Sequence, residues 1–510
     1  MITRLRHARN FCIKSSLHTT PQIYSCKARK KIPLTLHSSN VASTFYTCGP
    51  TVYDTAHIGH ASCYVRLDIL QRILRSHFNQ NIVTAMNITD IDDKIIRSAE
   101  EQKKPWQEIS RHYEEEFWDD LKRLNVRLPD IKMRVTENIP AIIAFISKLL
   151  NSGYAYKSTE KSVYFDISRY PQYGKLQNIP SDEIRVEGRK SAADFALWKA
   201  AKPNEPYWDS PFGQGRPGWH IECSTMASQI FGNRLNFHAG GMDLRFPHHE
   251  NEEAQSCCYH QVLDWVDYWI HTGQLHLVGQ GSKMSKSLKN TISIRELLDQ
   301  YSADEFRMFC MLSHYRNAVE YGDETMTVSV NVLKKFQSFF DDCKAYISGV
   351  KPAVAIDVSL LHTKLNEADQ QLDSYLRNDF NTAGAITCLG DLASEVNKMM
   401  NHSSEEIVIF SEVSTVQAIA NYIQAKLIMF GFESVDDAKR VVPFNAADNR
   451  SIDQLIESFI EIRGTVRNQA ILSKDRNLFA ICDQMRDHLR DVNVEVKDHG
   501  KSSSWRYVKQ

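Results

Sequence analysis

The sequence predicts an α/β protein in which a parallel sheet is interrupted by an insertion and followed by a helical bundle. A strand, a helix and a second strand follow one another between residues 44 and 86, and two more strand patterns come after residue 234. Such a unit begins a parallel sheet. Long helical patterns start near residue 326, and the 510 residues, 42% of them hydrophobic, supply material for several cores.

The first half of the sheet domain is predicted at residues 36–126. It opens with a strand from Thr44 to Cys48, which ends at a Gly-Pro turn. Apolar residues then recur at helical spacing as far as His77, and Asn81 to Met86 has the pattern of a buried strand.

The second half of the sheet domain is predicted at residues 212–325. Leu235 to Ala239 and Gln274 to Val278 are each followed by glycine, and both are predicted to be strands of the same parallel sheet. Residues 127–211 combine a helix, a short strand and many turn residues. We therefore expect this stretch to be a connective insertion.

The rest of the chain is predicted to be mainly helical. Residues 326–448 carry the patterns of a helical bundle, and residues 449–510 hold another helix, a short alternation and a polar tail. The longest mainly apolar stretch, Ile139 to Leu150, is broken by Lys148. It falls short of the roughly 20 apolar residues that a membrane span needs, so no membrane association is expected.

Charge is distributed unevenly along the chain. Eight of the 61 Lys and Arg residues lie between Met1 and Lys31, and no acidic residue precedes Asp54; without these eight, 53 basic residues face 62 acidic ones, a net charge of -9. A leader rich in Arg and Ser without a long apolar core is typical of a mitochondrial transit peptide. Residues 1–35 are predicted to be one, which implies the mitochondrial matrix; a disordered basic arm is the alternative. The 11 Cys residues form no dense disulfide framework.

His57-Ile-Gly-His60 stands just after the first strand, at a predicted helix N-terminus. The amides and dipole of a helix start favour an anion, Gly59 allows a close approach to the backbone, and two imidazoles can donate to phosphate oxygens. Two histidines in such a place are more often structural when nothing accompanies them.

Lys283-Met-Ser-Lys-Ser287 follows the last predicted strand in a glycine-rich setting. A basic pentapeptide alone is usually a solvated loop. Together, the HIGH and KMSKS motifs resemble the signature of class I aminoacyl-tRNA synthetases. The resemblance implies a Rossmann-type catalytic domain and catalysis by His57, His60, Lys283 and Lys286. It also implies that Gly59 and the two lysines bind ATP, and that Mg²⁺ is bound by the nucleotide.

Five further segments narrow the resemblance to the cysteinyl-tRNA synthetases. They are Cys48-Gly-Pro-Thr-Val-Tyr-Asp54, Asn87-Ile-Thr-Asp-Ile-Asp-Asp-Lys94, Asp194-Phe-Ala-Leu-Trp-Lys199, Pro217-Gly-Trp-His-Ile-Glu-Cys223 and Phe246-Pro-His-His-Glu-Asn-Glu252. The resemblance runs from about Thr44 to the C-terminus. It implies activation of L-cysteine by ATP, transfer to tRNA(Cys), a bundle that binds the anticodon stem, a small anticodon-binding region at residues 449–510, and a monomeric enzyme.

Cys48, Cys223, His248 and Glu252 have the donor types of a zinc site. His248 and Glu252 share a face if they lie on one helix, but sequence spacing alone does not single out this set, because a buried Cys is usually a small hydrophobe. The resemblance implies that these four residues bind one Zn²⁺ per chain. Cavity size alone would separate cysteine from serine only about 10- to 200-fold, whereas a zinc ion would select the thiolate.

The resemblance also assigns the remaining substrate contacts. Trp219 is expected in the cysteine pocket and Asp243 opposite the substrate ammonium. Some family members are credited with persulfide formation through a KIIK motif, but Lys94-Ile-Ile-Arg97 lacks the second lysine, which puts that activity in doubt. A local basic patch for tRNA is predicted near the C-terminus. Its residues are Lys497, Lys501, Arg506 and Lys509.

Two other functions fit parts of the pattern. A cysteine ligase acting on a small amine would have little use for some 180 residues of helical C-terminus, a length inferred from the predicted domain boundaries. A catalytically inactive tRNA-binding protein would not need intact signature motifs and zinc positions.

Overall fold

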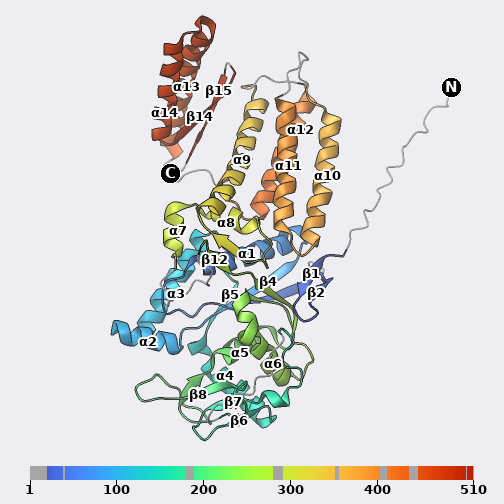
Figure 1. Cartoon of the computed structure of the whole chain (residues 1–510), viewed down its shortest axis with the longest axis vertical. Helices are drawn as coiled ribbons and strands as arrows, with labels where there is room; N and C mark the ends of the chain where they lie inside the picture. Colours follow the sequence, from blue (N-terminus) through green and yellow to red (C-terminus); the bar gives the residue numbers. More distant parts are fainter. Residues whose placement is uncertain are drawn as a thin grey trace, which may run out of the picture.

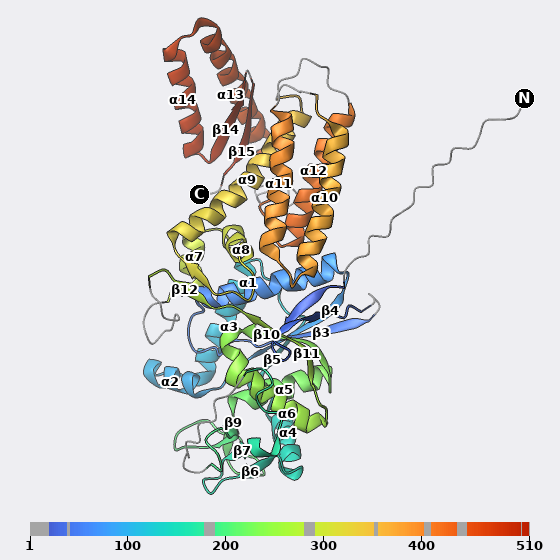
Figure 2. The same cartoon turned by 45° about the vertical axis from the view of Figure 1, so that its right-hand side comes forward.

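The computed structural model describes most of the chain: residues 20–37, 41–177, 189–279, 291–350, 355–401, 410–435, 446–500 and 502–508. The molecule is elongated (Figures 1 and 2). A small antiparallel sheet lies at one end, the main sheet in the middle, and a helical bundle with a C-terminal unit at the other end. No helix among the described residues is long and apolar enough to cross a membrane.

The main sheet has five parallel strands in the order β11-β10-β3-β4-β5. Their bounds are β3 (Ala42–Thr47), β4 (Asn81–Ile88), β5 (Ile131–Arg134), β10 (Leu235–Gly241) and β11 (Val266–Thr272). The chain builds outward from β3 on one side and then returns to pair β10 on the other. The carboxyl ends of β3 and β10 therefore flank the point where the strand order reverses, which is the usual ligand position in open α/β sheets.

Helices cover this sheet and begin close to its carboxyl ends. They are α1 (Ile58–Arg72), extended by a π-helical turn (Ile73–His77), α2 (Asp93–Gln102), α3 (Trp106–Arg123), α5 (Trp219–Phe231) and α6 (Glu250–His260). The apolar residues of α1 are buried in one core together with residues of the main sheet and of the helices that follow residue 300. Helix α1 therefore lies at the centre of the molecule.

One predicted strand belongs to a different sheet. The strand expected at Gln274 to Val278 forms as β12 (Leu275–Leu277), but β12 pairs with β13 (Val319–Tyr321) in a separate two-stranded sheet. The main-sheet assignment of this strand was wrong, and β11 is the edge strand instead. The chain leaves the sheet at Gly273, where a Cβ atom would lie 2.0 Å from the carbonyl oxygen of Asn317. Only glycine allows this approach of two backbones.

The insertion packs α4 (Ile139–Asn151) on a four-stranded antiparallel sheet. Its strands are β6 (Ala155–Lys157), β7 (Val163–Phe165), β8 (Phe195–Ala200) and β9 (Gly215–Pro217). The predicted boundaries of 127–211 differ from this sheet at both ends, since β5 pairs within the main sheet and β9 completes the small one. Strand partners decide these boundaries, and local sequence patterns do not reveal partners.

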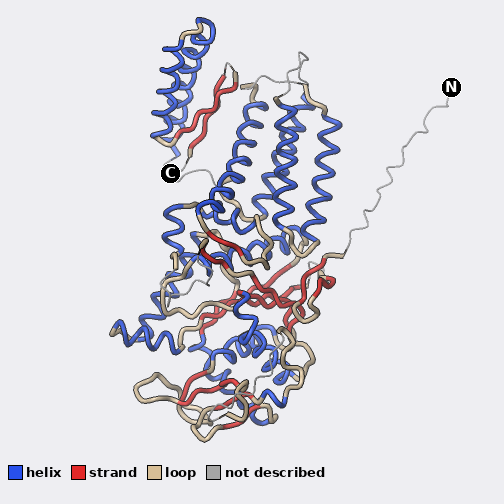
Figure 3. The backbone as a smooth tube through the Cα atoms, in the orientation of Figure 1, coloured by secondary structure: helices blue, strands red, loops and turns tan. Residues whose placement is uncertain are grey.

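Helices dominate the remainder of the chain, as predicted, and Figure 3 shows them as one bundle and one smaller unit. The bundle follows α7 (Ile294–Gln300) and α8 (Ala303–Met311) and consists of α9 (Asp323–Ile347), α10 (Val358–Arg377), α11 (Thr382–Met400) and α12 (Phe410–Met429). The C-terminal unit consists of α13 (Ala446–Ser473), α14 (Arg476–Asp491), β14 (Val494–His499) and β15 (Ser502–Tyr507).

An N-terminal hairpin corrects the predicted extent of the leader. Strands β1 (Gln22–Ser25) and β2 (Lys30–Pro33) pair within the range 1–35, and Ile23 and Leu34 are buried in the main core. Lys27 Nζ lies 2.7 Å from a carboxylate oxygen of Glu253 in α6. Residues 22–34 are therefore part of the folded body, because their side chains fill its core and pair with its buried charges.

The predicted basic patch is also changed. Lys497 Nζ lies 2.8 Å from the carboxylate of Asp342, and Arg506 lies 2.7 Å from Asp341, both on α9. These two cations attach the C-terminal unit to the bundle and are not a free basic surface. Lys501 and Lys509 lie outside the described residues.

Candidate active site

Four buried donor groups meet beneath the carboxyl ends of β3 and β10. Cys48 directly follows β3, Cys223 lies in α5, His248 lies on the π-helical turn Arg245–His249, and Glu252 lies in the first turn of α6. The two Sγ atoms are 3.7 Å apart, Cys48 Sγ is 3.5 Å from Glu252 Oε1, and His248 Nε2 is 3.0 Å from the same oxygen. All four donor atoms lie within 4.8 Å of one another.

This geometry fits a tetrahedral zinc ion. With Zn–S bonds of about 2.3 Å, two sulfurs on one tetrahedral centre are about 3.8 Å apart, close to the 3.7 Å between Cys48 and Cys223. Two sulfur donors, an imidazole and a carboxylate are the ligands that zinc takes in proteins. The residues predicted from the resemblance are therefore brought together as a metal site would require.

The electrostatics of the cluster favour an anionic sulfur. Burial raises the pKa of the Cys223 thiol, but the hydrogen bonds from Cys48 and His248 and the charge of His248 outweigh it and lower the pKa to about 6. Burial and the bond to Cys223 raise the pKa of Cys48 well above its usual range. Burial would raise the pKa of Glu252, yet His238 and His248 hold it at about 2. The contacts within the cluster therefore favour the ionised forms of Cys223 and Glu252.

Two further histidines adjoin the cluster and escaped the sequence analysis. His238 on β10 lies with Nε2 2.8 Å from Glu252 Oε2, and His249 lies with Nδ1 2.8 Å from His271 Nε2. With Cys48 and Glu252 they form a second group of donor atoms within 4.8 Å. The set with two thiols matches the preferences of zinc better. Strand alternation was a usable signal, because it puts His238 on the opposite face from its apolar neighbours Phe237 and Ala239.

The HIGH motif forms the N-terminal cap of α1. His57 Nδ1 accepts a hydrogen bond from the backbone N–H of Gly59 at 3.1 Å, and His60 Nδ1 accepts one from the N–H of His57 at 3.2 Å. The centroids of the two rings lie 4.0 Å apart, and the ring planes are tilted by 31°. Because each Nδ1 is an acceptor, the ring proton of each neutral imidazole sits on Nε2. Both rings are thus prepared to donate from Nε2 beside a helix N-terminus.

The chain that follows the KMSKS motif adjoins this cap from Ile292 onward. Lys283 and Lys286 lie outside the described residues, but the chain that follows them returns to the HIGH motif. The N–H of Ile58 donates to the carbonyl of Ile292 at 2.9 Å, and the N–H of Ile294 donates to the carbonyl of Ala56 at 3.2 Å. The C-terminal flank of the second motif is therefore paired with the first.

Comparisons with known proteins agree with this arrangement. Residues 35–331 match the family model for the tRNA synthetases class I (C) catalytic domain, and residues 373–424 match a DALR domain. A probable mitochondrial cysteine–tRNA ligase of Xenopus tropicalis is 41% identical over 95% of this chain and 89% of its own length. A cytoplasmic cysteine–tRNA ligase of Dictyostelium discoideum is 36% identical over 94% of this chain and 76% of its own length.

The chain belongs to the cysteine–tRNA ligase family. Its fold is shared more widely. A Mycobacterium tuberculosis methionyl-tRNA synthetase in complex with methionyl-adenylate superposes with a TM-score of 0.57 at 13% identity, covering 76% of this chain and 90% of that one. A putative arginyl-tRNA synthetase of Campylobacter jejuni gives 0.52 at 14% identity, covering 77% and 93%. These comparisons confirm the predicted class I synthetase fold.

The two predicted substrate residues lie in different surroundings in this cysteine–tRNA ligase. Trp219 begins α5, is 37% exposed, and stacks on His248 with ring centroids 4.2 Å apart. The structure therefore places Trp219 against the cluster of four donor groups. Asp243 is an exposed residue in the short 3₁₀ turn Met242–Leu244 that follows β10. It lies at the same carboxyl edge of the sheet as Cys48.

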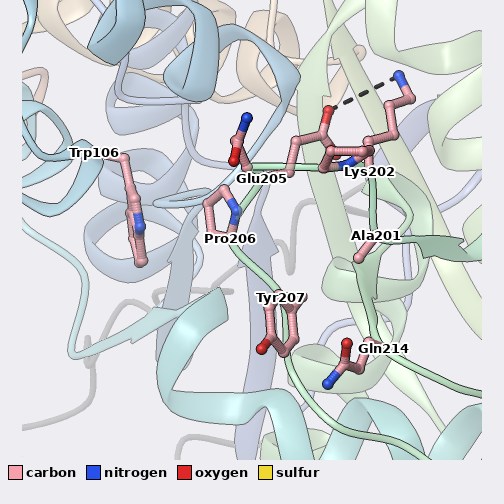
Figure 4. Close-up of a pocket in the computed structure, with 9 residues that line it drawn as sticks. Trp106, Ala201, Lys202, Glu205, Pro206, Tyr207 and Gln214 are labelled. Carbon is pink, nitrogen blue, oxygen red and sulfur yellow. Dashed lines mark ion pairs between the residues drawn. The ribbon is translucent and has the colours of Figure 1, made fainter.

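A surface groove is lined by residues other than those of the cluster and the HIGH cap. The groove in Figure 4 measures about 720 Å³ and lies between Trp106 at the start of α3 and the loop after β8. Tyr207 and Gln214 line it, and Lys202 pairs with Glu205 at 3.9 Å. It contains none of the predicted site residues. The candidate active site is therefore placed by its donor chemistry and not by the size of a hollow.

Proposed function

We propose that this cysteine–tRNA ligase activates L-cysteine with ATP to give cysteinyl-adenylate and pyrophosphate, and then transfers the cysteinyl group to the 3′ end of tRNA(Cys). The observation that carries the proposal is the buried cluster of Cys48, Cys223, His248 and Glu252, with Trp219 stacked over it. Of the amino acids that a class I synthetase activates, cysteine has the side chain best suited to a thiophilic metal.

We propose that the cluster holds one Zn²⁺. When bound, the ion would supply a Lewis acid with a strong preference for the thiolate of cysteine over the hydroxyl of serine. Glu252 is held in place by the hydrogen bond from His238, and His248 by the ring of Trp219. Such supporting contacts orient metal ligands and exclude water. Selection at this site would make a separate editing reaction unnecessary.

The HIGH cap would bind the phosphates of ATP. His57 and His60 donate from Nε2, and the N-terminus of α1 adds its backbone dipole. Gly59 leaves the backbone open to the nucleotide, which carries Mg²⁺, and Lys283 and Lys286 neutralise charge on the leaving pyrophosphate. Asp243 would accept a hydrogen bond from the substrate ammonium. The protein thus acts by positioning and by charge stabilisation rather than by covalent chemistry.

We propose that the enzyme works as a monomer in the mitochondrial matrix. Arg4, Arg6, Arg9 and Lys14 precede residue 20 without any acidic residue among them; without these four, 57 basic residues face 62 acidic ones. A fluorescent protein fused behind residues 1–21 is expected to enter mitochondria, and a cytosolic reporter would contradict the targeting. Light scattering on a sizing column tests the oligomeric state.

Cysteine-dependent exchange between ATP and pyrophosphate tests the activation step. The wild-type protein is expected to exchange with cysteine and to fail with serine. Lys286→Ala and Cys223→Ala are each expected to lose exchange, the first through the nucleotide and the second through the metal. Exchange supported by serine to within about tenfold of cysteine would contradict selection by zinc, since that ratio lies in the range of cavity size alone.

A further inference from the structure

Arg66 is a fully buried cation on the helix that the HIGH motif caps. It is 1% exposed and lies in α1, six residues after His60. Its Nη1 donates to the carbonyls of Asn317 at 3.0 Å, Tyr315 at 3.1 Å and Gly273 at 3.4 Å. Its Nη2 lies 3.0 Å from the hydroxyl of Ser313. One guanidinium thus binds three main-chain carbonyls and a hydroxyl.

These partners are all neutral, so no opposite charge among them offsets the free energy of burying the guanidinium of Arg66. Moving a charge out of water costs several kcal/mol unless the charge is paired. Even a complete buried ion pair often stabilises a fold less than a well-packed apolar side chain of similar size. Burial correspondingly lowers the pKa of Arg66. The fully buried Arg307 on α8 differs, since it lies 2.7 Å from the carboxylate of Asp68. Packing of α1 therefore gives no reason to keep a charge at position 66.

The carbonyls that Arg66 binds lie on the two segments that enter the small parallel sheet. Gly273 joins β11 to β12, and Tyr315 and Asn317 lie between α8 and β13. The N–H of Gly273 also donates to the carbonyl of Tyr315 at 2.9 Å. The guanidinium therefore fixes the start of β12 and the start of β13 at the same point on α1.

Both flanks of the segment 280–290 are consequently attached to one helix. On the outgoing side, β12 follows the contact of Arg66 with Gly273 within two residues, and Val278 N–H donates to the carbonyl of Tyr321 at 3.0 Å. On the returning side, Ile292 and Ile294 pair with the backbone around His57. The other strand, β13, leads directly into α9 of the bundle.

We propose that Arg66 is a positioning residue for adenylate formation: its guanidinium sets the β12–β13 sheet relative to the HIGH cap, and the chain continues from β12 to Lys283 and Lys286. This inference rests on the proposed function for the role of the two lysines. Arg66 touches neither substrate nor the metal cluster. Its effect is therefore on ATP and on the rate of activation, not on recognition of cysteine.

The test compares Arg66→Lys and Arg66→Met with Arg307→Lys, a matched loss of a buried guanidinium on the neighbouring helix. Pyrophosphate exchange gives kcat and the KM values for ATP and cysteine, and metal analysis gives the zinc content. Both Arg66 variants are expected to lower kcat by about 10- to 100-fold and to raise the KM for ATP, since a misplacement of about 1 Å costs up to about 100-fold. The KM for cysteine and the zinc content stay at the wild-type level, and Arg307→Lys leaves all these parameters within about twofold.

Hydrogen exchange in the whole chain supplies a readout that does not depend on activity. The Arg66 variants are expected to exchange faster in peptides covering 273–279 and 313–321, with unchanged protection in β10. Folded Arg66 variants with wild-type kcat and KM for ATP would overturn the proposal, as would lost activity without faster exchange in these peptides. Loss of protection throughout the chain would make Arg66 a folding residue and overturn it equally. A wild-type enzyme inactive with cysteine would instead refute the proposed function, while the hydrogen-exchange result would still report on Arg66.

Discussion

Removal of the N-terminal hairpin tests where the folded body begins. A chain that lacks residues 1–19 keeps β1 and β2, whereas a chain that lacks residues 1–35 loses both strands. The hairpin contributes Ile23 and Leu34, which are 0% and 1% exposed, to the main core. It also contributes Lys27, which lies closer to the fully buried Glu253 than Lys175 does. The longer deletion is therefore expected to destabilise the catalytic domain, and the shorter one is not.

The loss of stability expected from the longer deletion follows from these contacts. Full burial of an aliphatic side chain is worth about 1.5–3 kcal/mol, so Ile23 and Leu34 together contribute about 3–6 kcal/mol. Removing one partner of a buried ion pair costs about 3–5 kcal/mol. Because Lys175 remains 3.5 Å from the same oxygen of Glu253, the loss of Lys27 is expected to cost only about 2 kcal/mol. The sum of about 5–8 kcal/mol is comparable with the whole stability of a domain, about 5–15 kcal/mol.

Thermal unfolding and pyrophosphate exchange measure the outcome. The chain without residues 1–19 is expected to match the full chain in melting temperature and exchange rate. The chain without residues 1–35 is expected to be insoluble or to melt more than about 10 °C lower. Lys27→Met in the shorter deletion isolates the ion pair and should lower the melting temperature by a few degrees. Equal melting temperatures for the two deletions would show that the hairpin does not stabilise the folded body.

Three further outcomes are expected. Cys223→Ser should leave less than about 0.1 zinc per chain, whereas Cys258→Ser, also buried but not in the cluster, should keep the metal. Removal of residues 446–510 should weaken charging of tRNA and spare pyrophosphate exchange, because the unit lies far from the HIGH cap (Figure 1). Burial would raise the pKa of Asp498, but the hydrogen bonds from Arg463 and Ser503 hold it at about 2. The pair therefore stabilises the C-terminal unit above pH 4 by about 2 kcal/mol, and this stabilisation is lost as the pH falls toward 2; Asp498→Asn should remove that dependence in hydrogen exchange of α14.

One experimental result would contradict each of these expectations. Zinc retained in Cys223→Ser would remove that residue from the metal site. Charging and exchange that fall together on removal of residues 446–510 would place part of the activation machinery in the C-terminal unit. A pH dependence between 5 and 2 that survives in Asp498→Asn would assign it to another carboxylate.

Local signals in the sequence were sufficient for the elements that hold the site. The strand before Cys48 was predicted from its residues and from the Gly-Pro turn that follows, and it forms where expected. The HIGH motif was likewise placed at a helix start. These are properties of short segments, so the residues nearby in the chain decide them.

The meeting of the four donor residues could not be derived in that way. Cys48 and Cys223 are 175 residues apart in the sequence, and their 3.7 Å separation depends on the pairing of β3 with β10. Pairing across an insertion leaves no local signal, and only the resemblance to a family pointed to these positions. The same limitation explains why β12 was assigned to the wrong sheet.

Charge patterns alone gave wrong predictions at both ends of the chain. Lys27 was counted with a removable leader, and Lys497 and Arg506 were counted as a surface for RNA. In the structure these side chains pair with Glu253, Asp342 and Asp341. A run of basic residues reveals the sign of its charge but not whether an acidic partner lies elsewhere in the fold.

The central claim is that the buried cluster selects cysteine through a bound metal. The most direct measurement is X-ray absorption at the zinc edge of the purified enzyme, with and without cysteine. We expect one zinc per chain held by two sulfurs, one nitrogen and one oxygen, and one additional sulfur when cysteine is added. An unchanged sulfur count in an enzyme that is saturated with cysteine and active in exchange would contradict it.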